Sequence, residues 1–110
     1  MSFDDALIVL ADPARRAVLE QVCKRPCAIG DIAHALKPMS QPAVAQHLKA
    51  LEEAKLVKST RDGFRVFYSA ETQLLVGLRD FFVGMVGDII ADRRSASEPR
   101  RPQPAWRAHR

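Results

Sequence analysis

Apolar residues recur at spacings of three and four along the first half of the chain, a period that predicts short amphipathic helices. The first helix is predicted over residues 3 to about 11, because Ser2 and Asp5 form a capping-box pattern ahead of an apolar run. A second helix is predicted directly after Asp12 and Pro13. Asp is a good N-cap residue and Pro is tolerated at the first helical position, so the local chemistry agrees with the apolar spacing.

The middle of the chain repeats this pattern in two helices separated by a tight turn. A short helix is predicted over residues 29–36, and Lys37 and Pro38 end it. Ser40 then caps a longer helix over residues 41–54. A short helix, a turn and a second helix with a polar outer face predict a helix-turn-helix.

The period changes from helical to alternating just before residue 56. Over residues 56–69, Val, Thr, Phe and Tyr alternate with Lys and Arg on either side of Asp62-Gly63, which predicts a β-hairpin. A hairpin directly after the second helix of the pair predicts a winged helix-turn-helix. The expected fold class is therefore mainly α with a small β-hairpin (α+β).

A long helix is predicted over residues 71–92, with a broad apolar stripe at helical spacing. One small domain cannot easily cover a stripe of that length, so we expect a second copy of the chain to cover the rest. Gly77 and Gly84 lie on one side of this helix at a cost of about 1 kcal/mol each relative to Ala. Close approach of another helix or simple tolerance would account for them. We expect residues 1–92 to form one folded, dimerising domain and residues 93–110, rich in Arg and Pro, to be a disordered tail.

The net charge of +4 suggests a nucleic-acid partner, but its distribution changes that interpretation. Residues 93–110 carry six Arg against one Glu, a balance of +5, which leaves −1 for residues 1–92. Any DNA-binding surface on the folded part must therefore depend on where its charges lie. The sequence has no run of eighteen apolar residues and no basic N-terminal signal, so we expect a cytoplasmic protein with no membrane partner.

The outer face of the helix predicted over residues 41–54 is short-chained and free of acidic groups. Its apolar residues must face the core, and at 100° per residue Gln46 then points almost directly outward. Surface helices usually carry Asp or Glu in the first turn, but none occurs here from residue 37 to residue 51. Small residues allow close approach to base edges, and Gln can make bidentate contacts to adenine. The pattern favours a DNA-reading helix over an ordinary solvated helix.

The predicted hairpin, or wing, carries Arg61 and Arg65 on either side of its turn. Such groups reach phosphates or a minor groove beside the main contact, or they simply keep an exposed hairpin soluble. Together with the helix, contact with the DNA backbone is favoured. The predicted base contacts in the major groove are Ser40, Gln41, Ala43, Gln46 and His47, and the predicted phosphate contacts are Lys49, Arg61 and Arg65.

Three segments, LADPARRAVLEQV, IGDIAHALKPMSQPAVAQHLKALEEAKLV and RDGFRVFYSA, together resemble the ArsR/SmtB family of bacterial winged helix-turn-helix repressors. The resemblance keeps motif order and spacing from Leu10 to Ala70. It implies a homodimer, joined through its first and last helices, that binds a pseudo-palindromic operator in double-stranded DNA and blocks transcription. The KPMSQPAV turn is most similar to a branch with one extra residue there, many of whose members lack an evident metal site.

Metal-sensing members of that family carry thiols in the helix before the recognition helix. The matching stretch here, AIGDIA, has Ala28, Gly30 and Ala33 at those positions. Another family site uses Asp and His on the last helix, and residues 71–92 contain no His. We therefore expect no metal and no cofactor.

Cys23 and Cys27 leave the question of sensing open. Cys23 is expected to be a small buried thiol near the end of the second helix. Cys27 is expected to be exposed in the following loop, where Lys24 and Arg25 would lower its pKa. Both a structural role for Cys23 and a redox or thiophilic-metal switch through the pair fit the sequence, which names neither an inducer nor an operator.

The main rival hypothesis is a dimeric winged-helix module that binds a protein partner without sequence-specific DNA binding. The acid-free face of the helix argues against it. An enzyme is not expected, because the sequence shows no Gly-rich phosphate loop and no carboxylate pair suited to acid–base chemistry.

Overall fold

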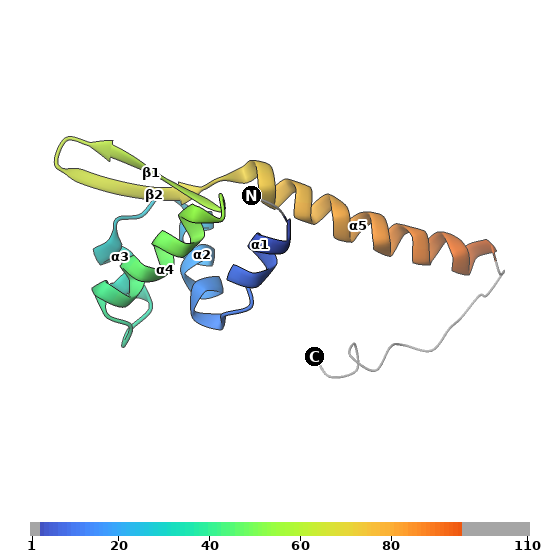
Figure 1. The fold of residues 1–110 in the computed structure, drawn as a ribbon, viewed down its shortest axis with the longest axis horizontal. Coiled ribbons are helices and arrows are strands. Elements are labelled where there is room, and N and C mark those ends of the chain that lie inside the picture. The colour runs from blue at the N-terminus through green and yellow to red at the C-terminus, as the bar shows by residue number, and fades with distance from the viewer. Residues whose placement is uncertain (1–2, 96–110) are drawn as a thin grey trace. The chain divides into compact units, whose positions relative to one another are not determined.

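The computed structural model describes residues 3–95, with side chains as far as residue 91. Four short helices, a hairpin and a long helix follow one another in the predicted order (Figure 1). The winged helix-turn-helix, α+β architecture is therefore confirmed. The elements are α1 (Phe3–Val9), α2 (Pro13–Lys24), α3 (Ile29–Ala35), α4 (Gln41–Glu53), β1 (Val57–Asp62), β2 (Arg65–Ala70) and α5 (Thr72–Ser95).

The ends of two helices differ from the prediction by more than one residue. α1 ends at Val9 instead of near residue 11, since the N–H of Ala11 bonds to the carbonyl of Ile8 in a tighter turn at 3.2 Å. α5 continues to Ser95, past the predicted end at residue 92. Ser2 of the predicted capping box and residues 96–110 of the predicted tail lie outside the described residues.

The starts of α2 and α4 are fixed by the side chains that precede them. Asp12 Oδ1 accepts a hydrogen bond from the N–H of Ala14 at 2.8 Å. Ser40 Oγ accepts one from the N–H of Ala43 at 3.2 Å. Each cap satisfies an N–H group that has no partner within its helix, so the predicted starts are confirmed.

α4 ends in a Schellman motif that leads directly into the hairpin. The N–H of Leu56 donates to the carbonyl of Leu51 at 2.9 Å, and the N–H of Lys55 donates to that of Glu52 at 3.0 Å. This closure puts Lys55 in the left-handed region, at φ 63°. Leu51 and Leu56 are both fully buried, as the motif requires of its apolar pair.

The hairpin pairs β1 with β2 antiparallel, from Val57 opposite Ala70 to Asp62 opposite Arg65. The connecting turn is therefore Gly63-Phe64, one residue later than predicted. Gly63 has φ +65°, a conformation that glycine adopts without steric cost. Cys27 adds a short bridge to the free edge of β2 through two hydrogen bonds with Tyr68, of 2.9 and 2.7 Å.

The core lies where α2, α3 and α4 meet the base of the hairpin. The inward positions that helical spacing predicts on α4 are all buried, which confirms the orientation of this helix. The largest fully buried side chains are Val18, Val22, Ile32, Val44, Leu48, Leu51, Leu56 and Val57.

The chain divides into two compact units, residues 1–78 and residues 79–110. In the first unit, the start of α5 joins the core through Leu78, and the ring of Phe3 lies 3.2 Å from the point that a Cβ on Gly77 would occupy. Gly77 thus leaves room for Phe3 of α1, whereas nothing lies within 4 Å of such a Cβ on Gly84.

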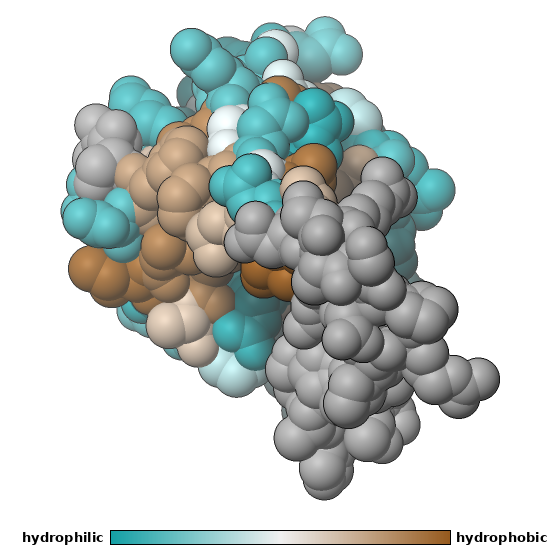
Figure 2. Space-filling view, turned by 90° about the vertical axis from the view of Figure 1, so that its right-hand side faces the viewer, coloured by the Kyte–Doolittle hydropathy of each residue, from teal (hydrophilic) through white to brown (hydrophobic). Residues whose placement is uncertain are grey.

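In the second unit, the described side chains of α5 leave a broad apolar stripe exposed. Figure 2 shows apolar side chains gathered beside polar ones on the face in view. Among the described helices, none has both the length and the apolar character needed to cross a membrane. The exposed apolar residues of this unit are Phe81, Phe82, Val83, Met85, Val86, Ile89 and Ile90.

Candidate nucleic-acid interface

The recognition helix α4 presents its predicted DNA-reading residues on the side opposite its buried face. The side chain of Gln46 is exposed on the outer face of the helix. Val44 and Leu48, two residues before and after it in sequence, are buried on the inner face. Ala43 and His47 are half-buried at the edges of the outer face, as expected of residues near the boundary. The structure therefore brings five predicted contacts together on α4 and a sixth, Ser40, at its N-cap; the five are Gln41, Ala43, Gln46, His47 and Lys49.

The first turn of α4 lies close to the start of α3. Gln41 Nε2 is 3.7 Å from the position that a Cβ on Gly30 would take, so the Gln41 side chain extends toward α3. The N-terminal N–H groups of α4 carry the positive end of the helix dipole, and no acidic residue occurs in its first turn. This end of the helix is suited to a DNA phosphate.

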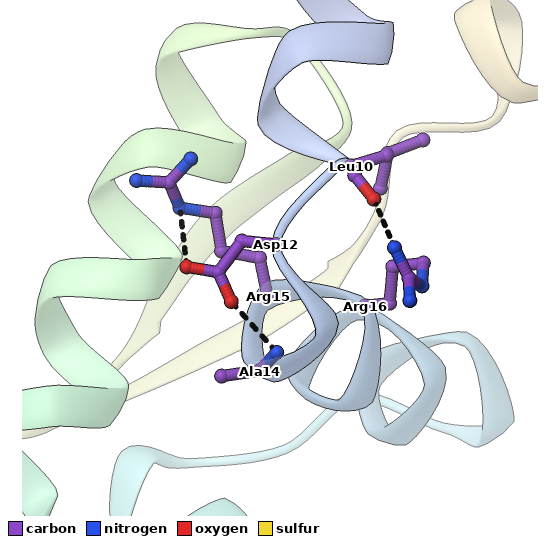
Figure 3. A network of polar contacts seen from close by, with 5 residues as sticks. All are labelled: Leu10, Asp12, Ala14, Arg15 and Arg16. Carbon is purple, nitrogen blue, oxygen red and sulfur yellow. Dashed lines mark hydrogen bonds and ion pairs between the residues drawn. The ribbon is translucent and has the colours of Figure 1, made fainter.

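The N-terminus of α2 contributes charge beside the middle of α4. The Ala14 N–H that bonds to Asp12 is the main cause that lowers the pKa of this carboxyl, and the charges of His47 and Arg15 lower it further. Arg15 Nε lies 4.0 Å from Asp12 Oδ2 (Figure 3). Because α2 packs on α4, Arg15 is a cation near the DNA-reading helix that sequence reasoning missed. The only sign of this role in the sequence was the Asp-x-x-Arg spacing of Asp12 and Arg15 at the start of α2.

The neighbouring Arg16 has a different role. Its Nη1 donates to the carbonyl of Leu10 at 2.7 Å, in the connection between α1 and α2 (Figure 3). This bond satisfies a carbonyl that the short helix leaves without an internal partner. Arg16 therefore fixes the α1–α2 corner.

The two wing arginines lie on opposite faces of the hairpin. Arg61 is opposite Val66, whereas Arg65 is opposite Asp62, and successive residues of a strand point to opposite faces. Arg61 shares its face with Ser59, whose Oγ donates to Glu52 Oε2 of α4 at 3.2 Å. The guanidinium of Arg65 lies over the ring of Phe67, 4.9 Å from its centroid. The predicted pair therefore forms two separate cationic points, one on each side of the wing.

Between these arginines, the tip of the wing carries Phe64. Its exposed fraction is 103%, the highest among the exposed large apolar side chains that the structure describes. Sequence reasoning placed Phe64 within the second strand, because it centred the turn on Asp62-Gly63. The observed register moves Phe64 into the turn itself.

The predicted environments of the two cysteines are wrong, because the structure exchanges them. Cys23 is exposed and Cys27 is buried. Cys27 Sγ donates to the carbonyl of Arg25 at 3.0 Å, and its backbone pairs with Tyr68. Burial raises the pKa of Cys27 despite the opposing charge of Arg25, so the expected activation of this thiol is also wrong.

The pKa of Cys23 is raised too, by partial burial and by the charge of Glu20. Thiolates are the reactive and metal-binding form of cysteine, so both shifts reduce reactivity near neutral pH. Within residues 3–91, no three His, Cys, Asp or Glu side chains are grouped so as to hold a metal ion.

Comparisons with known proteins agree on one family. Residues 12–59 match the model of the bacterial regulatory proteins of the arsR family. The HTH-type transcriptional regulator Rv2034 of Mycobacterium tuberculosis is 43% identical over 76 residues, which cover 69% of this chain and 70% of that protein. The transcriptional repressor SdpR of Bacillus subtilis is 32% identical over 66 residues, covering 60% and 72% of the two chains.

A solved structure, an ArsR-like transcriptional regulator from Rhodococcus sp. RHA1, superposes with a TM-score of 0.70 at 26% identity, covering 86% of this chain and 84% of that one. The matched segment includes the whole helix-turn-helix and the start of β1, as far as residue 59. These relatives are regulators and not enzymes, and they do not favour the rival protein-interaction module. The chain belongs to the arsR family of bacterial regulatory proteins and is a winged helix-turn-helix, DNA-binding transcriptional regulator.

Proposed function

We propose that this regulator is a homodimeric repressor that binds a pseudo-palindromic operator in the cytoplasm. The observation that carries the proposal is the outer face of α4, which is exposed at Gln46 and free of acidic residues from residue 37 to residue 51. A duplex repels acidic groups, so a helix that enters the major groove gains from their absence.

The acidic residues of α4 lie where they interfere least. Glu52 and Glu53 occupy the last turn, and Glu52 accepts the hydrogen bond from Ser59 of the wing. The repulsion that Glu52 and Glu53 exert on phosphates thus falls on the end of α4 that leaves the groove. Gln46 stands near the middle of the exposed face, where it can make two hydrogen bonds to adenine.

The remaining contacts would hold the protein in register on the duplex. Ser40 and Gln41, at the N-terminus of α4, would contact the major groove where the free N–H groups of the first turn favour a neighbouring phosphate. Ala43 would allow close approach to the base edges. His47 flanks Gln46 on the reading face. Lys49, Arg61 and Arg65 would neutralise phosphates, with the two arginines reaching from opposite faces of the wing.

A second copy of the chain would cover the apolar stripe of α5. The seven exposed apolar side chains of this stripe lie in the unit formed by residues 79–110. Within the described part of that unit, no other element covers them. Burial of a large apolar side chain contributes on the order of 1.5–3 kcal/mol, so a paired stripe is a sufficient source of dimer stability. A dimer also provides the two recognition helices that a pseudo-palindrome requires.

The proposal is tested by selection of binding sites from a pool of random duplexes. We expect the purified protein to enrich an inverted repeat with half-sites one helical turn apart. Selected and scrambled duplexes are then compared in a gel shift with excess competitor DNA. Equal affinity for both duplexes would contradict sequence-specific repression and would favour a module that binds another protein.

A further inference from the structure

We propose that Phe64 is a minor-groove contact: the ring at the tip of the wing enters the groove between the two backbones that Arg61 and Arg65 reach. The inference rests on the proposed binding of α4 in the adjacent major groove. It adds an apolar contact to a wing for which charge alone was expected.

The position of Phe64 has no explanation within the folded chain. It follows Gly63 in a two-residue turn, and its side chain is fully exposed. Every other exposed large apolar residue among those described lies on α1 or α5, the helices expected to pair with a second copy. Phe64 is therefore separate in sequence from the expected dimer surface, and a partner other than the second copy would have to cover it.

The charges around the tip favour a nucleic acid as that partner. Arg61 projects from one face of the hairpin and Arg65 from the other, so a cation lies on each side of Phe64. Lys58 shares the face of Arg65 further from the tip. The one acidic group of the turn region, Asp62, lies opposite Arg65 in the register, which offsets its charge.

This arrangement matches the shape of a minor groove. Paired strands lie about 4.8 Å apart, and the groove is about 6 Å wide, so only the tip of a hairpin can enter it. Arginines on both faces then meet the phosphates of both walls. Apolar wedges such as Phe are used by minor-groove proteins to contact sugars and to open flexible base steps. The wing would therefore add a preference for flexible or A·T-rich sequence at positions that α4 does not touch.

The test compares Phe64→Ser, Phe64→Leu and Arg61→Ala on a duplex that the unaltered protein has selected. Phe64→Ser should bind about tenfold more weakly, within the range found for removal of an aromatic contact, with an unchanged salt dependence. Phe64→Leu should recover most of the affinity, because it keeps an apolar tip. Arg61→Ala should instead lower the salt slope by about one, since it removes a phosphate contact.

Footprinting distinguishes a contact in the minor groove from a contact in the major groove. In the Phe64→Ser complex, hydroxyl-radical protection of the flanking minor groove should be lost, while methylation protection of guanines in the major groove is kept. Thermal unfolding should not change, because the ring is fully exposed. If Phe64→Ser changes neither the footprint nor the affinity, the proposed role of Phe64 is overturned but the proposed function is not. Absence of any protection by the unaltered protein would overturn the proposed function as well.

Discussion

Ser59 of the wing donates a hydrogen bond of 3.2 Å from its Oγ to Glu52 Oε2 in the last turn of the recognition helix. The bond connects the two parts of the molecule that are proposed to contact DNA. It lies on the same face of the hairpin as Arg61. The contact therefore favours one angle of the wing relative to α4, and so one placement of Arg61 and Phe64 on the duplex.

Loss of this contact should affect DNA binding more than folding. Ser59→Ala should lower the free energy of unfolding by less than about 1 kcal/mol, because the bond is exposed to water. The affinity for the selected duplex should fall severalfold as the wing becomes less well oriented. Thr60→Ala, which changes the opposite face, is the matched control. Equal affinity of Ser59→Ala and the unaltered protein would show that the bond does not orient the wing.

Gln46 and Arg65 should have different effects on specificity. Gln46→Ala should remove about 1–3 kcal/mol of discrimination at one base pair of each half-site, while binding to random DNA stays nearly constant. Arg65→Ala should weaken binding to all sequences alike. Titrations of selected and random duplexes with both variants check this. A uniform loss for Gln46→Ala would contradict its placement against a base.

The backbone at Lys55 should make a glycine stabilising there. Lys55 is in the left-handed region at φ 63°, where residues with a Cβ are strained by roughly 1–2 kcal/mol. Lys55→Gly should raise the free energy of unfolding by up to about 1 kcal/mol, after the entropic cost of glycine is subtracted. Lys58→Gly, which removes the same side chain from a strand, should lower it. The test is urea unfolding; destabilisation by Lys55→Gly would count against the αL closure of α4.

The two thiols should react slowly and in a fixed order. Since the pKa of each thiol is raised, both carry less thiolate at neutral pH than an ordinary cysteine, and alkylation should speed up as the pH rises. Cys23 should react first because it is exposed, whereas Cys27 is buried. Rates of iodoacetamide modification in Cys23→Ser and Cys27→Ser separate the two sites. Faster reaction at Cys27 would contradict its burial and would restore it as a sensor.

Features that depend on neighbouring residues were predicted well. The caps Asp12 and Ser40 act within their own first turns, and the inward face of α4 follows from the period of its apolar residues. The order of elements identified the winged helix-turn-helix for the same reason. These features need no knowledge of distant contacts.

Features that depend on distant pairing were not predicted. Cys27 is buried because its backbone pairs with Tyr68, far along the chain, and local composition carries no trace of that bridge. Phe64 is at the wing tip because the hairpin register places Asp62 opposite Arg65, one residue from the turn that Asp62-Gly63 suggested. Arg15 gained its position beside α4 only through packing of the two helices.

In the proposed complex, two copies of this chain join along α5 and place two α4 helices on successive turns of one duplex. Light scattering of the purified complex with the selected duplex measures this directly, because it gives the mass of protein per DNA. We expect a mass of two chains per duplex, and a mass of one chain for Val86→Glu, which places a charge in the exposed stripe. A single unaltered chain bound to the full inverted repeat would contradict binding as a dimer.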